Sequence, residues 1–140
     1  MITAVDTNIL IDVFGADPKF GEASLEALKL CAANGSLVAC DVVWVETATV
    51  FSSTDLCRNA MEKIGVQFSS IENETIWVAA DSWRKYRRSG GERERVAADF
   101  LIAAHGMLQS NRLLTRDRGF YRKYFGDLKI LDPSISLRRK

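Results

Sequence analysis

Short apolar runs alternate with longer helical segments along most of this 140-residue chain. Strands that are joined by helical crossovers run parallel in one sheet, and such a sheet is buried on both faces. The runs that we interpret as strands are residues 2–6, 36–40, 66–71, 112–116 and 128–131. The alternation therefore predicts an α/β fold, a three-layer sandwich in which helices flank a central, mostly parallel sheet of four to five strands.

The segments between these runs carry the marks of helices. Apolar residues recur at helical spacing between residues 21 and 33, and Asn34-Gly35 ends that helix. Asp41 is expected to cap the helix that continues through Trp44. In total we expect helices over residues 8–14, 21–33, 41–48, 55–64, 73–88, 95–109 and 119–125.

Length and composition indicate one globular domain over residues 1–140. Apolar residues make up 47% of the chain, and the net charge of +1 neither announces nor excludes a nucleic-acid partner. No apolar run approaches the roughly 20 residues that span a bilayer, and the N-terminus lacks the features of a secretory signal. The three cysteines show no metal-ligand spacing, so we expect reduced thiols in a cytoplasmic protein that does not bind membranes.

Four acidic residues occupy positions that such a sheet would bring together. Asp6 and Asp117 each end an apolar strand. Glu46 falls about one turn into the helix that leaves the second strand, and Asp99 lies near the start of the helix that leads to the strand ending at Asp117. Because open parallel sheets bind ligands outside the carboxyl ends of their strands, we expect all four acids at one rim of the sheet.

Electrostatic repulsion would make such a group of acids unstable without compensation. Two carboxylates about 4 Å apart repel by roughly 4 kcal/mol at an effective dielectric constant near 20. Several such pairs would rival the whole stability of a small domain, about 5–15 kcal/mol. Either some carboxyls stay protonated or a cation neutralises them, and oxygen ligands favour Mg²⁺ or Mn²⁺. A carboxylate group that binds Mg²⁺ suits phosphoryl chemistry.

Each acid also has a structural interpretation. Asp6 can cap the helix that follows it, Glu46 can be a solvated helix residue, and Asp117 can belong to a turn. Asp99 is harder to explain in this way, because a charged group on an apolar helix is unfavourable unless it is paired or bound to a ligand. His105, the only histidine, faces away from Asp99 on an ideal helix, so a structural or surface position is expected.

The residues around the four acids resemble the four motifs of PIN-domain ribonucleases, specifically the VapC-type toxins of bacterial and archaeal toxin–antitoxin pairs. The similar segments are, in order, residues 5–10, 42–46, 99–104 and 113–120. Motif order and spacing are preserved over essentially the whole chain. Each motif alone is weak, whereas the four together in a domain of this size are specific.

The resemblance implies a divalent-metal-dependent endoribonuclease that hydrolyses RNA phosphodiester bonds. It implies that one or two Mg²⁺ or Mn²⁺ ions are held by the catalytic residues Asp6, Glu46, Asp99 and Asp117. It further implies that Asn8 and Thr115 support these acids by hydrogen bonding. A cognate antitoxin protein that blocks the site, a homodimer, and inhibition of translation or growth are also implied.

Basic and aromatic residues near the motifs are candidates for contact with RNA. Arg93, Arg95 and Arg116 could hold phosphates beside the scissile bond, although a solvated surface position is an open alternative. Tyr86 or Phe120 could stack on an unpaired base. Some of the three tryptophans are expected in the core, and others could line a groove that holds a helix of the antitoxin.

Other functions stay open on the sequence alone. A housekeeping PIN-domain nuclease for RNA processing would share the chemistry and differ in its biological role. A non-catalytic RNA-binding module is disfavoured by the intact set of four acids. A phosphatase of the haloacid dehalogenase type would require a second acid two residues after Asp6, where this chain has Asn8.

Overall fold

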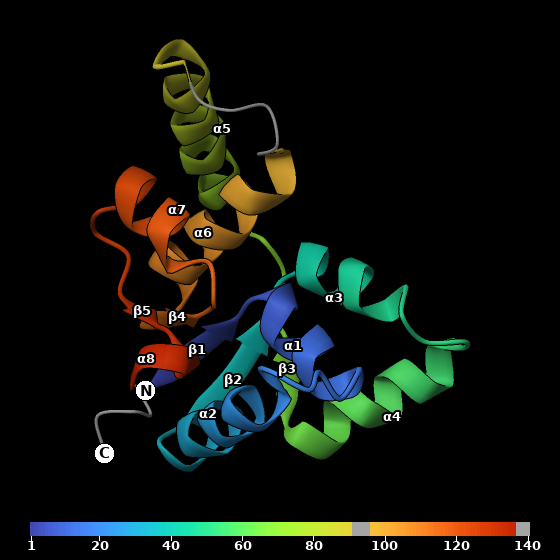
Figure 1. The fold of residues 1–140 in the computed structure, drawn as a ribbon. Coiled ribbons are helices and arrows are strands. Elements are labelled where there is room, and N and C mark those ends of the chain that lie inside the picture. The colour runs from blue at the N-terminus through green and yellow to red at the C-terminus, as the bar shows by residue number, and fades with distance from the viewer. Residues whose placement is uncertain (91–95, 137–140) are drawn as a thin grey trace.

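Five parallel strands form the centre of the fold (Figure 1). The computed structural model describes residues 1–90 and 96–136. Within these ranges the strand order is β3-β2-β1-β4-β5, and every neighbouring pair is parallel. The predicted α/β sandwich with a central parallel sheet is therefore confirmed. The strands are β1 (Ile2–Val5), β2 (Ser36–Ala39), β3 (Val66–Phe68), β4 (Arg112–Leu114) and β5 (Ile130–Leu131).

Helices connect these strands close to the positions expected. They are α1 (Thr7–Phe14), α2 (Gly21–Ala33), α3 (Asp41–Ala48), α4 (Thr54–Ile64), α5 (Asn73–Arg88), α6 (Ala97–Gln109), α7 (Arg118–Tyr124) and α8 (Pro133–Ser136). The strands are shorter than expected, and α8 was not expected at all. Asp132 precedes α8 and accepts hydrogen bonds from the backbone N–H and hydroxyl of Ser134 at 2.9 and 2.6 Å. In the described ranges, no helix combines the length and apolar character needed to cross a bilayer.

Strand β1 lies in the middle of the sheet. Its residue Thr3 is opposite Leu37 of β2 and opposite Arg112 of β4. Thr3, Ala4 and Val5 are at most 2% exposed, so both faces of the strand are covered. The largest side chains of the core come from several helices and strands and include Ile9, Leu10, Leu28, Leu37, Met61, Phe100, Leu113 and Leu114.

The chain extends the sheet from β1 in two opposite directions. Strands β2 and β3 are added on one side, and β4 and β5 on the other. Because parallel crossovers are right-handed, the helices between β1 and β3 cover one face and those between β3 and β5 cover the other. Figure 1 shows α5, α6 and α7 grouped together, apart from α1, α2 and α4. The carboxyl ends of β1 and β4 therefore border the crevice where open α/β sheets bind ligands.

Helix ends agree with the sequence at α4 and differ at α3. Gly65 ends α4 with φ of +79°, a conformation that glycine adopts without strain. The expected N-cap at Asp41 is wrong, because Cys40 is the N-cap and Asp41 is the first helical residue. The Asp41 carboxylate instead accepts the backbone N–H of Ile71 at 2.7 Å. This long-range bond holds the β3–α5 connection while the negative charge stays at the positive end of the helix dipole.

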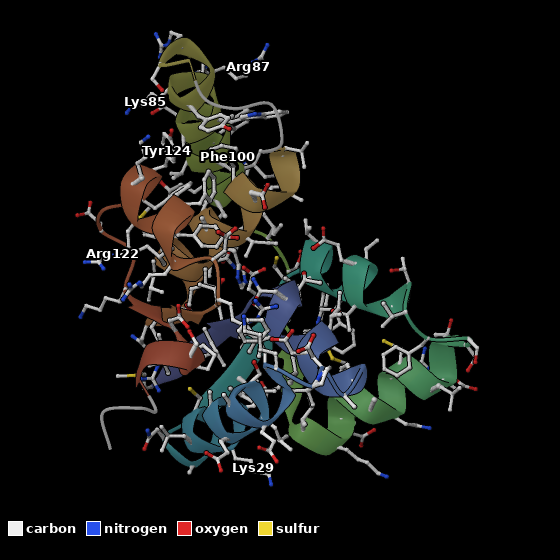
Figure 2. All side chains as sticks on the ribbon, in the orientation of Figure 1. Lys29, Lys85, Arg87, Phe100, Arg122 and Tyr124 are labelled. Atoms are coloured by element: carbon white, nitrogen blue, oxygen red, sulfur yellow. The ribbon has the colours of Figure 1, made fainter. Side chains whose placement is uncertain are left out.

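An aromatic cluster joins α5 and α7 to α6, and Figure 2 labels two of its members, Phe100 and Tyr124. The Phe100 ring lies 5.4 Å from Tyr86 and 5.5 Å from Phe120, measured between centroids. Tyr124 lies 4.9 Å from Tyr86. Tyr86 and Phe120 are 4% and 9% exposed, so the expected role of either ring in stacking on a base is wrong. Both rings pack the helices against one another.

Candidate functional site

Asp6 ends β1 and begins α1, and its carboxylate is surrounded by donors. The backbone N–H of Thr7 donates to Oδ1 at 2.7 Å. Oδ2 accepts the Thr115 hydroxyl at 2.7 Å and the Tyr121 hydroxyl at 3.1 Å, with Asn8 Nδ2 at 3.5 Å. Asp6 is 5% exposed. It is therefore both the helix cap and the buried centre of the site.

Burial sets the protonation behaviour of Asp6. Removal of water from the carboxylate raises its pKa to about 6, and the charge of Asp117 adds to this rise. Hydrogen bonds from Thr115, Thr7 and Tyr121 act in the opposite direction and offset only part of it. Near neutral pH, ionisation of Asp6 therefore lowers the free energy of unfolding. A bound cation would remove this loss of stability.

Asp117 lies between β4 and α7, beside Asp6. The Asp117 N–H donates to Thr115 Oγ1 at 3.0 Å, and the same hydroxyl donates to Asp6. Asn8 Nδ2 donates to this oxygen as well, at 3.3 Å. Thr115 and Asn8 thus link the ends of β1 and β4, at the positions where hydrogen-bonding support of the acids was expected.

Glu46 reaches the same edge from α3. Its Oε1 accepts the Thr7 hydroxyl at 2.6 Å, and Thr7 also donates its N–H to Asp6. Helix α3 contacts both α1 and α6, which orients this face of α3 toward the site. Thr7 therefore links Glu46 to Asp6 through hydrogen bonds.

Asp99 approaches from the first turn of α6. Its Oδ2 accepts the backbone N–H of Val96 at 3.2 Å, so the side chain lies at the N-terminus of the helix. This position explains why an acid is tolerated in an otherwise apolar helix, since the helix dipole favours a negative charge there.

The phenol of Tyr121 lies within electrostatic reach of three of the four acids. Tyr121 is 1% exposed, and burial raises its pKa well above the usual range. The negative charges of Asp6, Asp99 and Asp117 raise the pKa further. The Tyr121 hydroxyl therefore stays protonated and donates to Asp6 at 3.1 Å, and the charges of Asp99 and Asp117 act on it from a distance.

The predicted basic contacts have different positions. Arg116 pairs with Asp12, with Nε 2.6 Å from Oδ2 and Nη2 2.9 Å from Oδ1. Arg93 and Arg95 lie outside the described residues. In Figure 2, Arg122 points outward from α7, and Lys85 and Arg87 lie toward the outer end of α5.

The donor set fits a hard divalent cation in its chemistry. The predicted ligands are all carboxylates, and carboxylate oxygen is the preferred protein ligand of Mg²⁺ and Mn²⁺. Burial raises the pKa of Asp6, so its ionised form is unfavourable at neutral pH without a counter-charge. Over the described part of the chain, no three acid, histidine or cysteine side chains are already gathered into a metal cluster. The acids share one edge of the sheet without forming a closed ligand set.

Tyr121 and Thr7 are site residues that the sequence reasoning missed. Tyr121 lies four residues after Asp117, and this spacing places two side chains on the same face of a helix. Thr7 stands next to Asp6, where a hydroxyl can serve a neighbouring acid. Asp12 was also overlooked, although a charge inside the apolar run of residues 9–14 requires a partner.

Comparison with known proteins places the fold among those of toxin–antitoxin complexes. VapBC2 from Rickettsia felis, bound to a promoter DNA fragment, is similar with a TM-score of 0.74 at 15% identity, covering 94% of this chain and 98% of that chain. VapBC-1 from nontypeable Haemophilus influenzae has a TM-score of 0.72 at 19% identity, covering 96% and 99%. A toxin–antitoxin complex from Klebsiella pneumoniae has a TM-score of 0.69 at 20% identity, covering 94% and 97%. At these identities the similarity demonstrates a shared fold.

Sequence comparison assigns the family. No curated protein matches the chain significantly. The family model described as the PIN domain matches residues 3–126, which includes all four predicted acids and most of the chain. The chain therefore belongs to the PIN domain family.

Proposed function

We propose that this protein is a divalent-metal-dependent endoribonuclease, a single nuclease domain over residues 1–140, and the toxin of a type II toxin–antitoxin pair. The observation that carries the proposal is the hydrogen-bond network at the carboxyl edge of the sheet, in which Thr115 links Asp6 to the Asp117 backbone and Thr7 links Asp6 to Glu46. Membership of the PIN domain family and the fold shared with VapBC complexes support it. Three free, buried cysteines are compatible with action in the cytoplasm, where thiols stay reduced.

The four acids would bind one or two Mg²⁺ or Mn²⁺ ions. Asp6, Asp99, Asp117 and Glu46 would supply the oxygen ligands. When bound there, the cation supplies Lewis-acid polarisation of the scissile phosphate and activates water for hydrolysis. Thr115 and Tyr121 donate to Asp6 Oδ2 and favour its ionised form, while Asn8 keeps the β4–α7 connection against α1.

Mapping of RNA ends tests the nuclease proposal. Brief expression of the wild-type protein is expected to inhibit growth and to create new RNA ends, whereas Asp6→Asn and Asp99→Asn abolish both effects. Purified wild-type protein is expected to cut RNA with Mg²⁺ or Mn²⁺ and to stop when EDTA is added. Asp55→Asn is the matched control, because Asp55 is an exposed acid on α4, paired with Arg58 at 3.5 Å. Unchanged cleavage and growth inhibition by both site variants would refute the proposal.

We further propose that an antitoxin segment binds a groove between α3 and α4. The groove has a volume of about 510 Å³ and is lined by Trp44, Val45 and Phe51, among others. Val45 is an apolar residue that is 67% exposed, and it precedes Glu46 on α3. A segment bound there would lie beside an acid of the site and could block access to it.

Co-purification tests this partner. The complex with the antitoxin is expected to lack nuclease activity, and Val45→Arg is expected to weaken the complex while the free toxin stays active. Analytical ultracentrifugation of the free protein tests the proposed homodimer. Full nuclease activity of an intact complex would refute inhibition by the antitoxin.

A further inference from the structure

Arg116 has the position of an active-site cation, next to Asp117, yet its guanidinium is directed at Asp12 of α1. Nε donates to Asp12 Oδ2 at 2.6 Å and Nη2 donates to Asp12 Oδ1 at 2.9 Å. The side chains of Arg116 and Asp12 are 26% and 4% exposed. A two-point, mostly buried pair of this kind has a fixed geometry, unlike an exposed ion pair.

Additional groups hold both members of this pair. Ser24 of α2 donates its hydroxyl to Asp12 Oδ2 at 2.9 Å. The Phe20 ring lies under the guanidinium, 3.9 Å from Cζ to the ring centroid. Phe20 is itself placed by Asp17, whose Oδ1 accepts the Phe20 N–H at 2.8 Å. The Arg116 side chain is therefore fixed between α1 and the start of α2.

The backbone of Arg116 is continuous with that of Asp117, one of the four acids, and both are hydrogen-bonded to residues of the site. The Arg116 N–H donates to Asn8 Oδ1 at 3.3 Å, and the Asp117 N–H donates to Thr115 Oγ1 at 3.0 Å. Thr115 in turn donates to Asp6. A displacement of Arg116 would therefore shift Asp117 relative to Asp6.

Negative charges around Arg116 make it a poor phosphate ligand. The carboxylate of Asp12 is paired with the guanidinium, and the charges of Asp17 and Asp132 also act on it. The local field that stabilises this cation would repel an RNA phosphate. Two of the three nitrogens of the guanidinium are already engaged with Asp12.

We infer that Arg116 is a positioning residue, anchored by Asp12 and Phe20, that fixes Asp117 beside Asp6 and does not bind the substrate. The inference rests on the proposed nuclease function for its catalytic consequence. It replaces the expectation that Arg116 holds an RNA phosphate. The positioning role and the phosphate role predict opposite effects of substitutions at Asp12.

Asp12→Asn distinguishes the two roles. If Arg116 positions Asp117, Asp12→Asn and Arg116→Lys are both expected to lower kcat about tenfold or more and to weaken metal binding, with the KM for RNA within about twofold of wild type. The salt dependence of RNA binding should stay the same, because no phosphate contact is lost. If Arg116 binds phosphate, Asp12→Asn frees the guanidinium and tightens RNA binding, and Arg116→Lys preserves most of it. That pattern would overturn the inference.

Amide hydrogen exchange separates this inference from the nuclease proposal. In protein without metal or RNA, the amides of Arg116 and Asp117 are expected to exchange about tenfold faster in Asp12→Asn, while those of β1 are unchanged. Isothermal titration with Mn²⁺ then measures the metal affinity directly. Asp55→Asn is the control for both measurements, as an exposed acid-to-amide change far from Arg116 in sequence.

Each outcome has a defined meaning. Unchanged exchange at Arg116 and Asp117 in Asp12→Asn would overturn the anchoring role, whatever the activity. Lack of RNA cleavage by the wild-type protein would refute the proposed function, and the exchange measurement would still decide the anchoring. If Asp12→Asn does not fold, Arg116→Lys carries the same measurements, because it keeps both charges and loses only the two-point geometry and the ring contact.

Discussion

At the scale of single residues, Asp6 shows how burial and hydrogen bonding compete at a candidate metal ligand. Four groups donate to its two oxygens, yet burial still raises the pKa to about 6. The chain thus keeps a carboxyl in a position where ionisation is unfavourable without a counter-charge. Such a departure from ordinary stability rules is typical of functional sites.

Asp6→Asn is expected to change how stability depends on pH. A carboxyl with a raised pKa binds a proton more tightly in the folded state, so its stabilising effect is complete below about pH 4 and is lost as pH rises through 6. From pH 4 to pH 8, the unfolding free energy of wild type should therefore fall by about 2–3 kcal/mol relative to Asp6→Asn. Urea unfolding in EDTA measures this difference. Parallel pH profiles for the two proteins would contradict it.

Thr47 offers a second residue-scale prediction. It is fully buried on α3, and no residue in the described ranges bonds its hydroxyl. Thr47→Val replaces this hydroxyl with a methyl group and is expected to raise the unfolding free energy by about 1 kcal/mol. Thr75→Val is the matched control, because the buried Thr75 hydroxyl donates to Gln109 Oε1 at 2.7 Å and its loss should destabilise. A loss of stability in Thr47→Val would indicate an unrecognised partner.

At the scale of elements, α6 links the sheet to the other helices on its face. It packs on β1 and β4, holds α5 through the aromatic cluster, and carries Asp99 at its first turn. His105 of the same helix is 1% exposed, and its Nε2 lies 2.9 Å from the hydroxyl of Ser69, the residue after β3. The expected structural role of His105 agrees with this contact.

His105 should make the protein sensitive to acid. Burial lowers its pKa below 6.5, while the charge of Asp41 and a bond to Ser69 oppose this shift. A lowered pKa means that stability is complete above pH 6.5 and is lost as pH falls through the folded-state pKa. Between pH 7 and pH 5, the unfolding free energy of wild type should therefore fall more than that of His105→Gln, which can still bond Ser69. Thermal unfolding over this range measures it, and equal slopes would contradict it.

At the scale of the whole molecule, the strand order makes the site possible. Asp6 and Tyr121 are 115 residues apart in sequence and are joined by a hydrogen bond of 3.1 Å. They meet because β1 and β4 are neighbours, although β2 and β3 lie between them along the chain. The acids therefore belong to four separate segments, and only the folded sheet brings them to one edge.

Metal binding should stabilise the folded molecule as a whole. A ligand that binds only the folded state adds about 2.7 kcal/mol at a hundred times its Kd, which corresponds to a Tm increase of roughly 5–10 °C for a chain of this size. Wild type in Mn²⁺ is expected to show such a shift, and Asp6→Asn or Asp99→Asn a much smaller one. Differential scanning calorimetry measures it, with NaCl at equal ionic strength as the control. A wild-type Tm that matches the NaCl control would contradict it.

Local sequence patterns were sufficient for the fold class, for the placement of Asp6 and Asp117 after strands, and for the placement of Glu46 in the helix that follows the second strand. Hydrophobic periodicity and helix-ending residues are properties of short segments. The helix end at Gly65 and most other helix boundaries could therefore be predicted without tertiary information. Side-chain partners were not predictable in this way. Asp41 illustrates the limit. A local capping rule predicted that it caps its own helix, whereas in the fold its carboxylate accepts the backbone N–H of Ile71.

The sequence by itself thus determined a parallel α/β fold of the PIN domain family, with acids placed along one edge of its sheet. Tertiary structure alone decided which groups those acids and their neighbours contact. It buried Tyr86 and Phe120 in the aromatic cluster, directed Arg116 to Asp12, and brought Tyr121 to Asp6. The physical reason is that hydrophobic periodicity acts over a few residues, whereas hydrogen bonds and ion pairs depend on distances between segments that only the packed sheet sets.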